Sequence, residues 1–191
     1  MKPSIKIVAA GLLAMCIVFS LCSCGGGVRE SFEECIEAIK NCDFNRFRLC
    51  ATEGSGQAVE LIRSKYELLG EEKAAVLRSL LSYINISYYG DDIEEKSERT
   101  LLVTLSCVDL TALSRDVSSE ISVSGIPAAE IISGLIDDGT VAERYVRTDD
   151  IKVKLTEVDG TWQVPFSAEA NNELVGKLGL HAFARWFANQ G

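Results

Sequence analysis

The spacing of apolar residues along this chain changes near Ile84, from a helical period of about 3.6 residues to a strand period of two. Upstream of that point the pattern predicts a helix over about residues 29–41, a short helix from Phe44, a third helix that Gly70 ends, and a fourth. The stretch Ser31-Phe-Glu-Glu34 has the spacing of a capping box for the first helix. The first half of the folded chain is therefore expected to be helical.

Alternating apolar and polar residues in the second half predict an antiparallel sheet. The expected strands cover about residues 84–88, 101–107, 151–156 and 162–166. Asp159-Gly160 supplies the tight turn of a hairpin between the last two. The stretch from Glu94 to Arg99 mixes both charge signs and is expected to be a solvated loop.

Helical patterns interrupt and follow this sheet. Asp109 is placed to cap one helix, and Pro127 opens a second. A final helix from Ser167 carries one apolar stripe, made of Leu174, Leu178, Ala182 and Trp186. Together these patterns predict an α+β fold in a single domain, residues 29–191, with N-terminal helices packed on a curved antiparallel sheet, a helical insertion over about residues 111–139 and a C-terminal helix.

The N-terminus has the three parts of an export signal. Lys2 and Lys6 precede an uncharged apolar run from Ile7 to Cys22, which is shorter than the roughly 20 residues of a membrane span. An uncleaved anchor helix from about Ile7 is the alternative reading. Either reading places the remainder of the chain outside the cytoplasm.

Leu21-Cys-Ser-Cys24 resembles the lipobox of bacterial lipoproteins, in which a cysteine follows small residues and a leucine. The resemblance implies cleavage after residue 23, a diacylglyceryl group on Cys24 and a short glycine linker over residues 24–28. Two acyl chains hold a protein on a bilayer where one chain is marginal. The expected location is thus the extracytoplasmic face of the cell membrane, with the membrane as a partner through this anchor.

The net charge of −9 excludes nucleic acid as an expected partner, because an acidic surface repels the phosphate backbone. Loss of Lys2 and Lys6 with the signal makes the mature chain more acidic still.

Four of the seven cysteines belong to the domain: Cys35, Cys42, Cys50 and Cys107. Two antiparallel helices that meet near Cys42 would bring Cys35 and Cys50 face to face, where they can form a disulfide. The alternative is that the thiols serve as small buried apolar groups. Their spacing lacks the paired CxxC of a structural zinc site, and the acidic doublets lack the register of a calcium loop, so neither a metal nor a cofactor is expected.

The order of elements resembles the nuclear-transport-factor-2-like, cystatin-like domains found in uncharacterised lipoproteins of Gram-positive bacteria. The residues that carry the resemblance are 32–47 with the break at Asn41-Cys-Asp-Phe44, the strand of 100–110 that runs into a helical insertion, and 151–164 with Val158-Asp-Gly-Thr-Trp162. The resemblance implies a sheet curved into a cone, from which the insertion departs.

Enzymes of that superfamily use a carboxylate base and hydrogen-bond donors inside the cone. Asp109, Tyr88 and Tyr145 are the polar candidates here, and their spacing gives no reason for them to converge. His181, the single histidine, lies among apolar residues of the last helix and is expected to be structural. No catalytic residue is therefore assigned.

The sequence favours a non-catalytic binding or interaction module in the cell envelope, whose ligand is another protein, a peptide or an apolar small molecule. The alternative is an isomerase- or dehydratase-type enzyme that acts on an apolar substrate. An enzyme of that type needs at least two polar side chains in one cavity.

Overall fold

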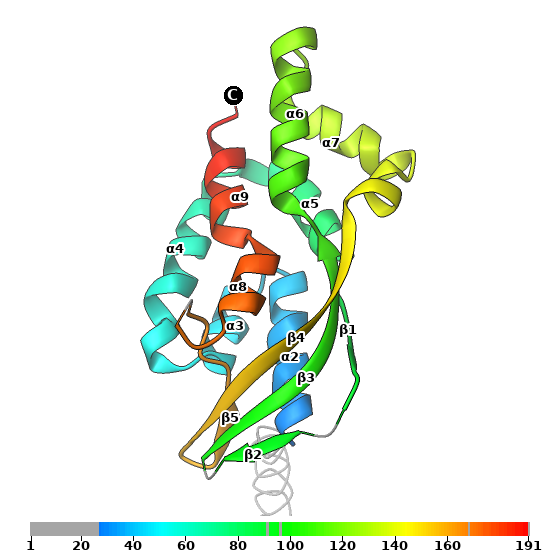
Figure 1. Ribbon diagram of the computed structural model, residues 1–191. Coiled ribbons are helices and arrows are strands. Elements are labelled where there is room, and N and C mark those ends of the chain that lie inside the picture. Colours follow the sequence, from blue (N-terminus) through cyan, green and yellow to red (C-terminus); the bar gives the residue numbers. More distant parts are fainter. Residues whose placement is uncertain (1–26, 91, 96, 168, 191) are drawn as a thin grey trace, which may run out of the picture.

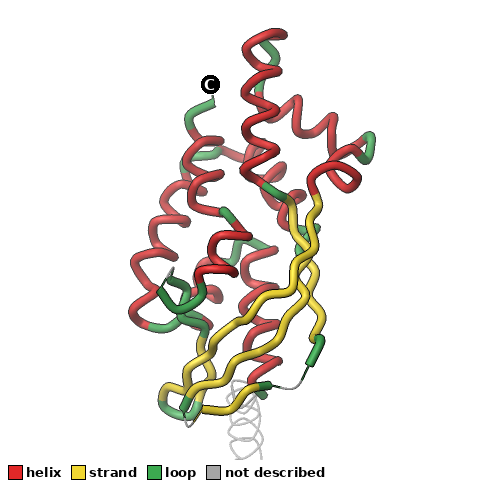
Figure 2. The backbone as a smooth tube through the Cα atoms, viewed as in Figure 1, coloured by secondary structure: helices red, strands yellow, loops and turns green. Residues whose placement is uncertain are grey.

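The computed structural model describes residues 27–90, 92–95, 97–167 and 169–190 of the 191-residue chain. These residues form eight α-helices and five strands, and the strands make one open antiparallel sheet, so the fold is α+β (Figures 1 and 2). The expected signal peptide and the lipidation residue Cys24 lie outside the described residues.

The first helix, α2 (Val28–Lys40), begins three residues earlier than its expected cap. Gly27, not Ser31, is the N-cap residue, and its backbone N–H donates to the Glu30 carboxylate at 2.7 Å. The capping box predicted from Ser31 is therefore wrong. Gly27 and Ser31 are each followed three residues later by a glutamate that can accept from the backbone N–H of the cap residue. This spacing alone therefore did not decide at which residue the helix begins.

Three more helices follow α2 and confirm the helical first half: α3 (Phe44–Cys50), α4 (Gly56–Glu67) and α5 (Gly70–Leu81). Asp43 caps α3 by accepting a hydrogen bond from the Arg46 N–H at 3.0 Å. α4 ends at Glu67, three residues before the expected Gly70, and Gly70, with a φ of +73° that suits glycine, is instead the first residue of α5.

The sheet has the strand order β1-β3-β4-β5, with β2 beside the start of β3. The bounds of the strands are Asn85–Tyr88, Ile93–Glu95, Glu98–Val108, Val146–Val158 and Thr161–Gln163. Val103 lies opposite Ile151 in the long β3–β4 pair. One face buries alternate residues of these two strands, while Thr104 and Asp150 lie on the other face and hydrogen-bond each other at 2.6 Å.

The charged stretch expected to be a loop is a β-hairpin instead. Glu94 lies opposite Arg99 across β2 and β3 and forms an ion pair with it. All three residues of β2 are exposed, so this edge strand shows none of the apolar alternation on which the sequence prediction relied.

The helical insertion separates β3 from β4 and projects beyond one end of the sheet (Figure 1). It consists of α6 (Leu110–Ser124) and α7 (Ala128–Asp137), followed by a π-helical turn, Val141–Tyr145, that leads into β4. Asp109 caps α6 by accepting from the Ala112 N–H at 2.9 Å, as its position predicted.

The last hairpin also agrees with the sequence. Asp159 and Gly160 both have positive φ, +50° and +77°, which is the turn geometry that an Asp-Gly pair favours between β4 and β5.

The C-terminal helix is two helices, so the prediction of one is wrong. α8 (Asn172–Leu178) and α9 (Leu180–Ala188) meet at Gly179, whose φ of +56° breaks the helical path. The break rotates the second helix, so Ala182 is exposed and the buried stripe of α9 is Leu180, Phe183, Ala184 and Phe187.

Buried side chains from the helices and from one face of the sheet form one apolar cluster. Its largest fully buried members include Phe32, Phe47, Leu105, Ile151 and Phe187. None of the described helices is both long enough and apolar enough to cross a membrane.

Candidate functional site

The polar residues singled out from the sequence do not converge on one cavity. Tyr88 lies on β1, where its hydroxyl contacts the Glu33 carboxylate at 3.2 Å and the Arg29 carbonyl at 3.3 Å. Burial, followed by the charge of Glu33, raises the pKa of Tyr88. Tyr145 and Asp109 lie together at the base of the insertion, where the Asp109 N–H donates to the Tyr145 carbonyl at 2.8 Å.

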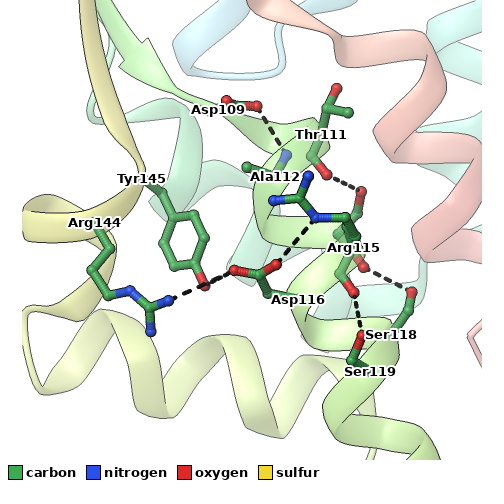
Figure 3. A network of polar contacts seen from close by, with 10 residues as sticks. Asp109, Thr111, Ala112, Arg115, Asp116, Ser118, Ser119, Arg144 and Tyr145 are labelled. Atoms are coloured by element: carbon green, nitrogen blue, oxygen red, sulfur yellow. Dashed lines mark hydrogen bonds and ion pairs between the residues drawn. The ribbon is translucent and has the colours of Figure 1, made fainter.

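The Tyr145 side chain belongs to a polar network centred on Asp116 of α6 (Figure 3). Its hydroxyl donates to the Asp116 carboxylate at 3.0 Å, and Arg115 and Arg144 lie 3.3 Å and 3.8 Å from the same group. The hydrogen bond from Tyr145 is the largest cause that holds the pKa of Asp116 below its usual value. This network joins α6 to the π-helical turn. The Asp116 carboxylate already has a hydroxyl and two guanidinium groups as partners, so we interpret the network as a structural contact.

A pocket of about 440 Å³ lies between α4 and the α8–α9 pair. Most of the residues that line it are apolar or glycine: Ala58, Leu61, Ile62, Phe166, Val175, Gly176, Gly179, Leu180 and Ala182. Thr111, Ser167 and His181 are its polar lining residues. The volume lies in the range of small-molecule sites, which have largely apolar walls and a few polar groups.

Phe166, which lines this pocket, is held by a buried serine. Ser55 is 2 % exposed, and its hydroxyl oxygen accepts a hydrogen bond from the Phe166 N–H at 2.6 Å. The Phe166 ring then packs edge-on against Phe47 of α3, with ring centroids 5.0 Å apart. The loop after α3 thereby fixes one wall of the pocket.

The opposite wall is held by Asn171, directly before α8, which is 2 % exposed. Its side-chain amide accepts from the Lys154 N–H at 2.7 Å and donates to the Lys154 carbonyl at 3.0 Å and the Pro165 carbonyl at 2.9 Å. In the same way Glu173 accepts from the Lys152 N–H at 3.0 Å. These side chains satisfy backbone groups of β4 beyond the short β5, so α8 is fixed against the sheet.

Gly176 of α8 leaves the pocket open. A Cβ atom placed there would have no neighbour within 4 Å, and the backbone has no positive φ, so a larger residue is sterically allowed. Gly134 of α7 is the matching case away from the pocket, since it is also a helical glycine with nothing within 4 Å.

A shallower groove of about 610 Å³ continues the pocket along α4. The two share Ala58, Leu61, Phe166 and Ser167, and the groove adds the polar residues Gln57, Glu60 and Ser64. Leu61, 44 % exposed, lines both parts. Two further cavities have volumes of only about 10 Å³ each, far smaller than this groove.

Cys35 is fully buried in α2, and the neighbouring Cys50 adds to the effect of burial in raising the pKa of its thiol. Cys35 is present as a thiol. The pairing of Cys35 with Cys50 stays a prediction. Burial, then the charge of Asp149, raises the pKa of Cys107 to about 11.

Within the described residues, no three histidine, cysteine or acidic side chains gather as metal ligands. His181 lies at the pocket, which its place in the sequence did not indicate. The other lining residues were missed as well, because they come from α4, α6, the 166–167 segment and α8–α9 and share no motif. Comparison with models of protein families, with curated protein sequences and with solved structures finds no match for this chain.

Proposed function

We propose that this chain is a lipid-anchored extracytoplasmic protein whose domain binds an apolar small molecule in the groove between α4 and α8–α9. The observation that carries the proposal is the pocket of about 440 Å³, whose walls are mainly aliphatic, aromatic or glycine. An apolar ligand there gains free energy from the area that it removes from water.

The choice of a binding module over an enzyme rests on the chemistry of the lining. Thr111, Ser167 and His181 offer two hydroxyls and one imidazole, and no carboxylate is among the residues that line the deep pocket. An isomerase or dehydratase of the cone type would need a carboxylate base beside the substrate. The enzyme therefore stays the second candidate, with His181 as the base that it would have to use.

The tether is proposed from the sequence, where Leu21-Cys-Ser-Cys24 resembles a lipobox. Only Gly25, Gly26 and Gly27 separate Cys24 from α2, so the start of α2 would stand within about 13–14 Å of the acyl-bearing residue. We also propose that the curved sheet and its covering helices are a variant of the nuclear-transport-factor-2-like cone. The long β3–β4 pair with helices on its apolar face supports this assignment.

The binding proposal is tested with the full chain, purified from membranes and transferred from detergent into amphipol. A neutral alkyl diazirine is added and activated by light, and the labelled peptides are mapped by mass spectrometry. We expect labelling on α4 and on α8–α9, the two walls of the pocket.

Gly176→Phe should fill the pocket and remove most of that labelling, while Gly134→Phe should leave it unchanged. Thermal unfolding by circular dichroism checks that both variants are folded, and Gly176→Leu replaces Gly176→Phe if the larger ring unfolds the domain. Equal labelling of the α4 peptides in wild type and in the folded Gly176 variant would refute the pocket.

The tether is tested by growth with a radioactive fatty acid. We expect label in the wild-type chain and none in Cys24→Ala. A soluble, unlabelled wild-type product would refute this part of the proposal and leave the pocket untouched.

A further inference from the structure

The shallow part of the groove carries the polar side chains that a ligand emerging from the deep pocket would meet. Gln57, Glu60 and Ser64 lie along α4 at one-turn spacing and line this part, while the deep part is mainly apolar. A molecule that occupies both parts is therefore amphiphilic, with an apolar chain at α8–α9 and a polar head group over α4.

Glu60 is the single aspartate, glutamate, lysine or arginine among the residues that line either part. Its carboxylate lies 3.5 Å from the Arg48 guanidinium and 3.9 Å from that of Arg63. Arg63 in turn pairs with Glu67 at 2.9 Å. Two carboxylates thus face two guanidinium groups, and the cluster offers no net charge to a charged head group.

The remaining polar groups at the head-group end are an amide and two hydroxyls. Ser64 donates its hydroxyl to the Leu61 carbonyl at 2.9 Å and keeps its oxygen lone pairs available to a ligand. The Ser167 oxygen accepts from the Ala170 N–H at 3.3 Å and keeps its proton. Gln57 is exposed and offers both a donor and an acceptor. These side chains together offer both hydrogen-bond donors and acceptors. They suit ligand groups that can donate and accept a hydrogen bond at the same time, namely hydroxyls.

From this arrangement we infer that the ligand is an amphiphile with one apolar chain and an uncharged, hydroxyl-bearing head group. The inference rests on the proposed function of the groove and adds the class of molecule that it selects. A glyceride and an alkyl glycoside share this chemistry.

The test is competition against the alkyl diazirine in the amphipol-held full chain. Four competitors with the same ten-carbon chain are compared: monodecanoylglycerol, decyl glucoside, decanoate and decyltrimethylammonium. Each satisfied hydrogen bond is expected to strengthen binding about two- to tenfold, so at least one neutral competitor should protect the α4 peptides at a several-fold lower concentration than either ion. The order of the two neutral compounds identifies the glyceride or the glycoside as the source.

Charge is tested separately by salt and by substitution. Protection by the neutral compounds should not weaken between low and high salt, because screening weakens only interactions between charged groups. Glu60→Gln leaves Arg48 without its carboxylate and should shift protection toward decanoate, with a new dependence on salt. Gln57→Ala should reduce the advantage of the neutral compounds over the two ions, because it removes one donor and one acceptor from the head-group end.

The outcomes separate the two proposals. If labelling is insensitive to Gly176→Phe, the groove is not a binding site and both fail. If the groove is labelled but decanoate or decyltrimethylammonium protects as well as the neutral compounds, only the head-group inference fails.

Discussion

Asn171 gives the sharpest test of how the pocket wall is built, because one buried side chain satisfies three backbone groups. Its amide contacts the N–H and carbonyl of Lys154 and the carbonyl of Pro165 at 2.7–3.0 Å. Asn171→Ala removes all three hydrogen bonds and takes this partner from two backbone groups of β4 and from one carbonyl just after β5. At a net 0.5–1.5 kcal/mol for each bond, the loss is about 3 kcal/mol in the free energy of unfolding.

The matched control is Asn172→Ala, the same chemical change one residue later at an exposed position. Urea unfolding followed by circular dichroism should show a lower midpoint with an unchanged slope for Asn171→Ala, and almost no shift for Asn172→Ala. For a domain of this size, about 3 kcal/mol corresponds to a fall of roughly 6–12 °C in Tm.

Asn171→Asp separates hydrogen bonding from shape. A carboxylate at this position still accepts from the Lys154 N–H but faces the two carbonyl oxygens, so we expect a loss of stability at neutral pH. Protonation restores one donor, and the variant should therefore recover part of that loss as the pH falls. Losses for Asn171→Ala equal to those for Asn172→Ala would show that water replaces the three bonds and would refute the reasoning.

Two further predictions concern titratable groups. The Tyr145 hydroxyl lowers the pKa of Asp116, so the stability that this contact contributes is present above the ordinary aspartate pKa and is lost as the pH falls through the lowered value. In Asp116→Asn the midpoint of unfolding should therefore depend less on pH over that acidic range. A pH profile identical to that of the wild type would contradict this prediction. Burial raises the pKa of Cys107 to about 11, so iodoacetamide at pH 8 should modify it far more slowly in the folded chain than in urea, as measured by mass spectrometry; equal rates would show that the thiol is accessible.

The sequence predicted the elements whose signals are local. The change of period near Ile84, the Asp109 cap and the Asp159-Gly160 turn each depend on a few neighbouring residues, and the structure agrees with all three. The edge strand β2 and the break at Gly179 escaped prediction for related reasons. An edge strand that is exposed on both faces does not alternate apolar and polar residues. A single glycine inside a helix leaves the helical spacing of its apolar residues almost unchanged.

The expectation of an exported, lipid-anchored chain comes from the sequence by itself, because the apolar run and Leu21-Cys-Ser-Cys24 are contiguous. The pocket is a product of tertiary structure alone. Its walls come from Leu61 on α4, Phe166, and Leu180 on α9, which are separated by more than 100 residues at the extremes. Each of these residues reads in sequence as an ordinary core position, and only the packing of α8 on β4 through Asn171 leaves a hollow beside them. A hollow forms where distant side chains fail to fill the space between elements, and residue periodicity does not carry that information.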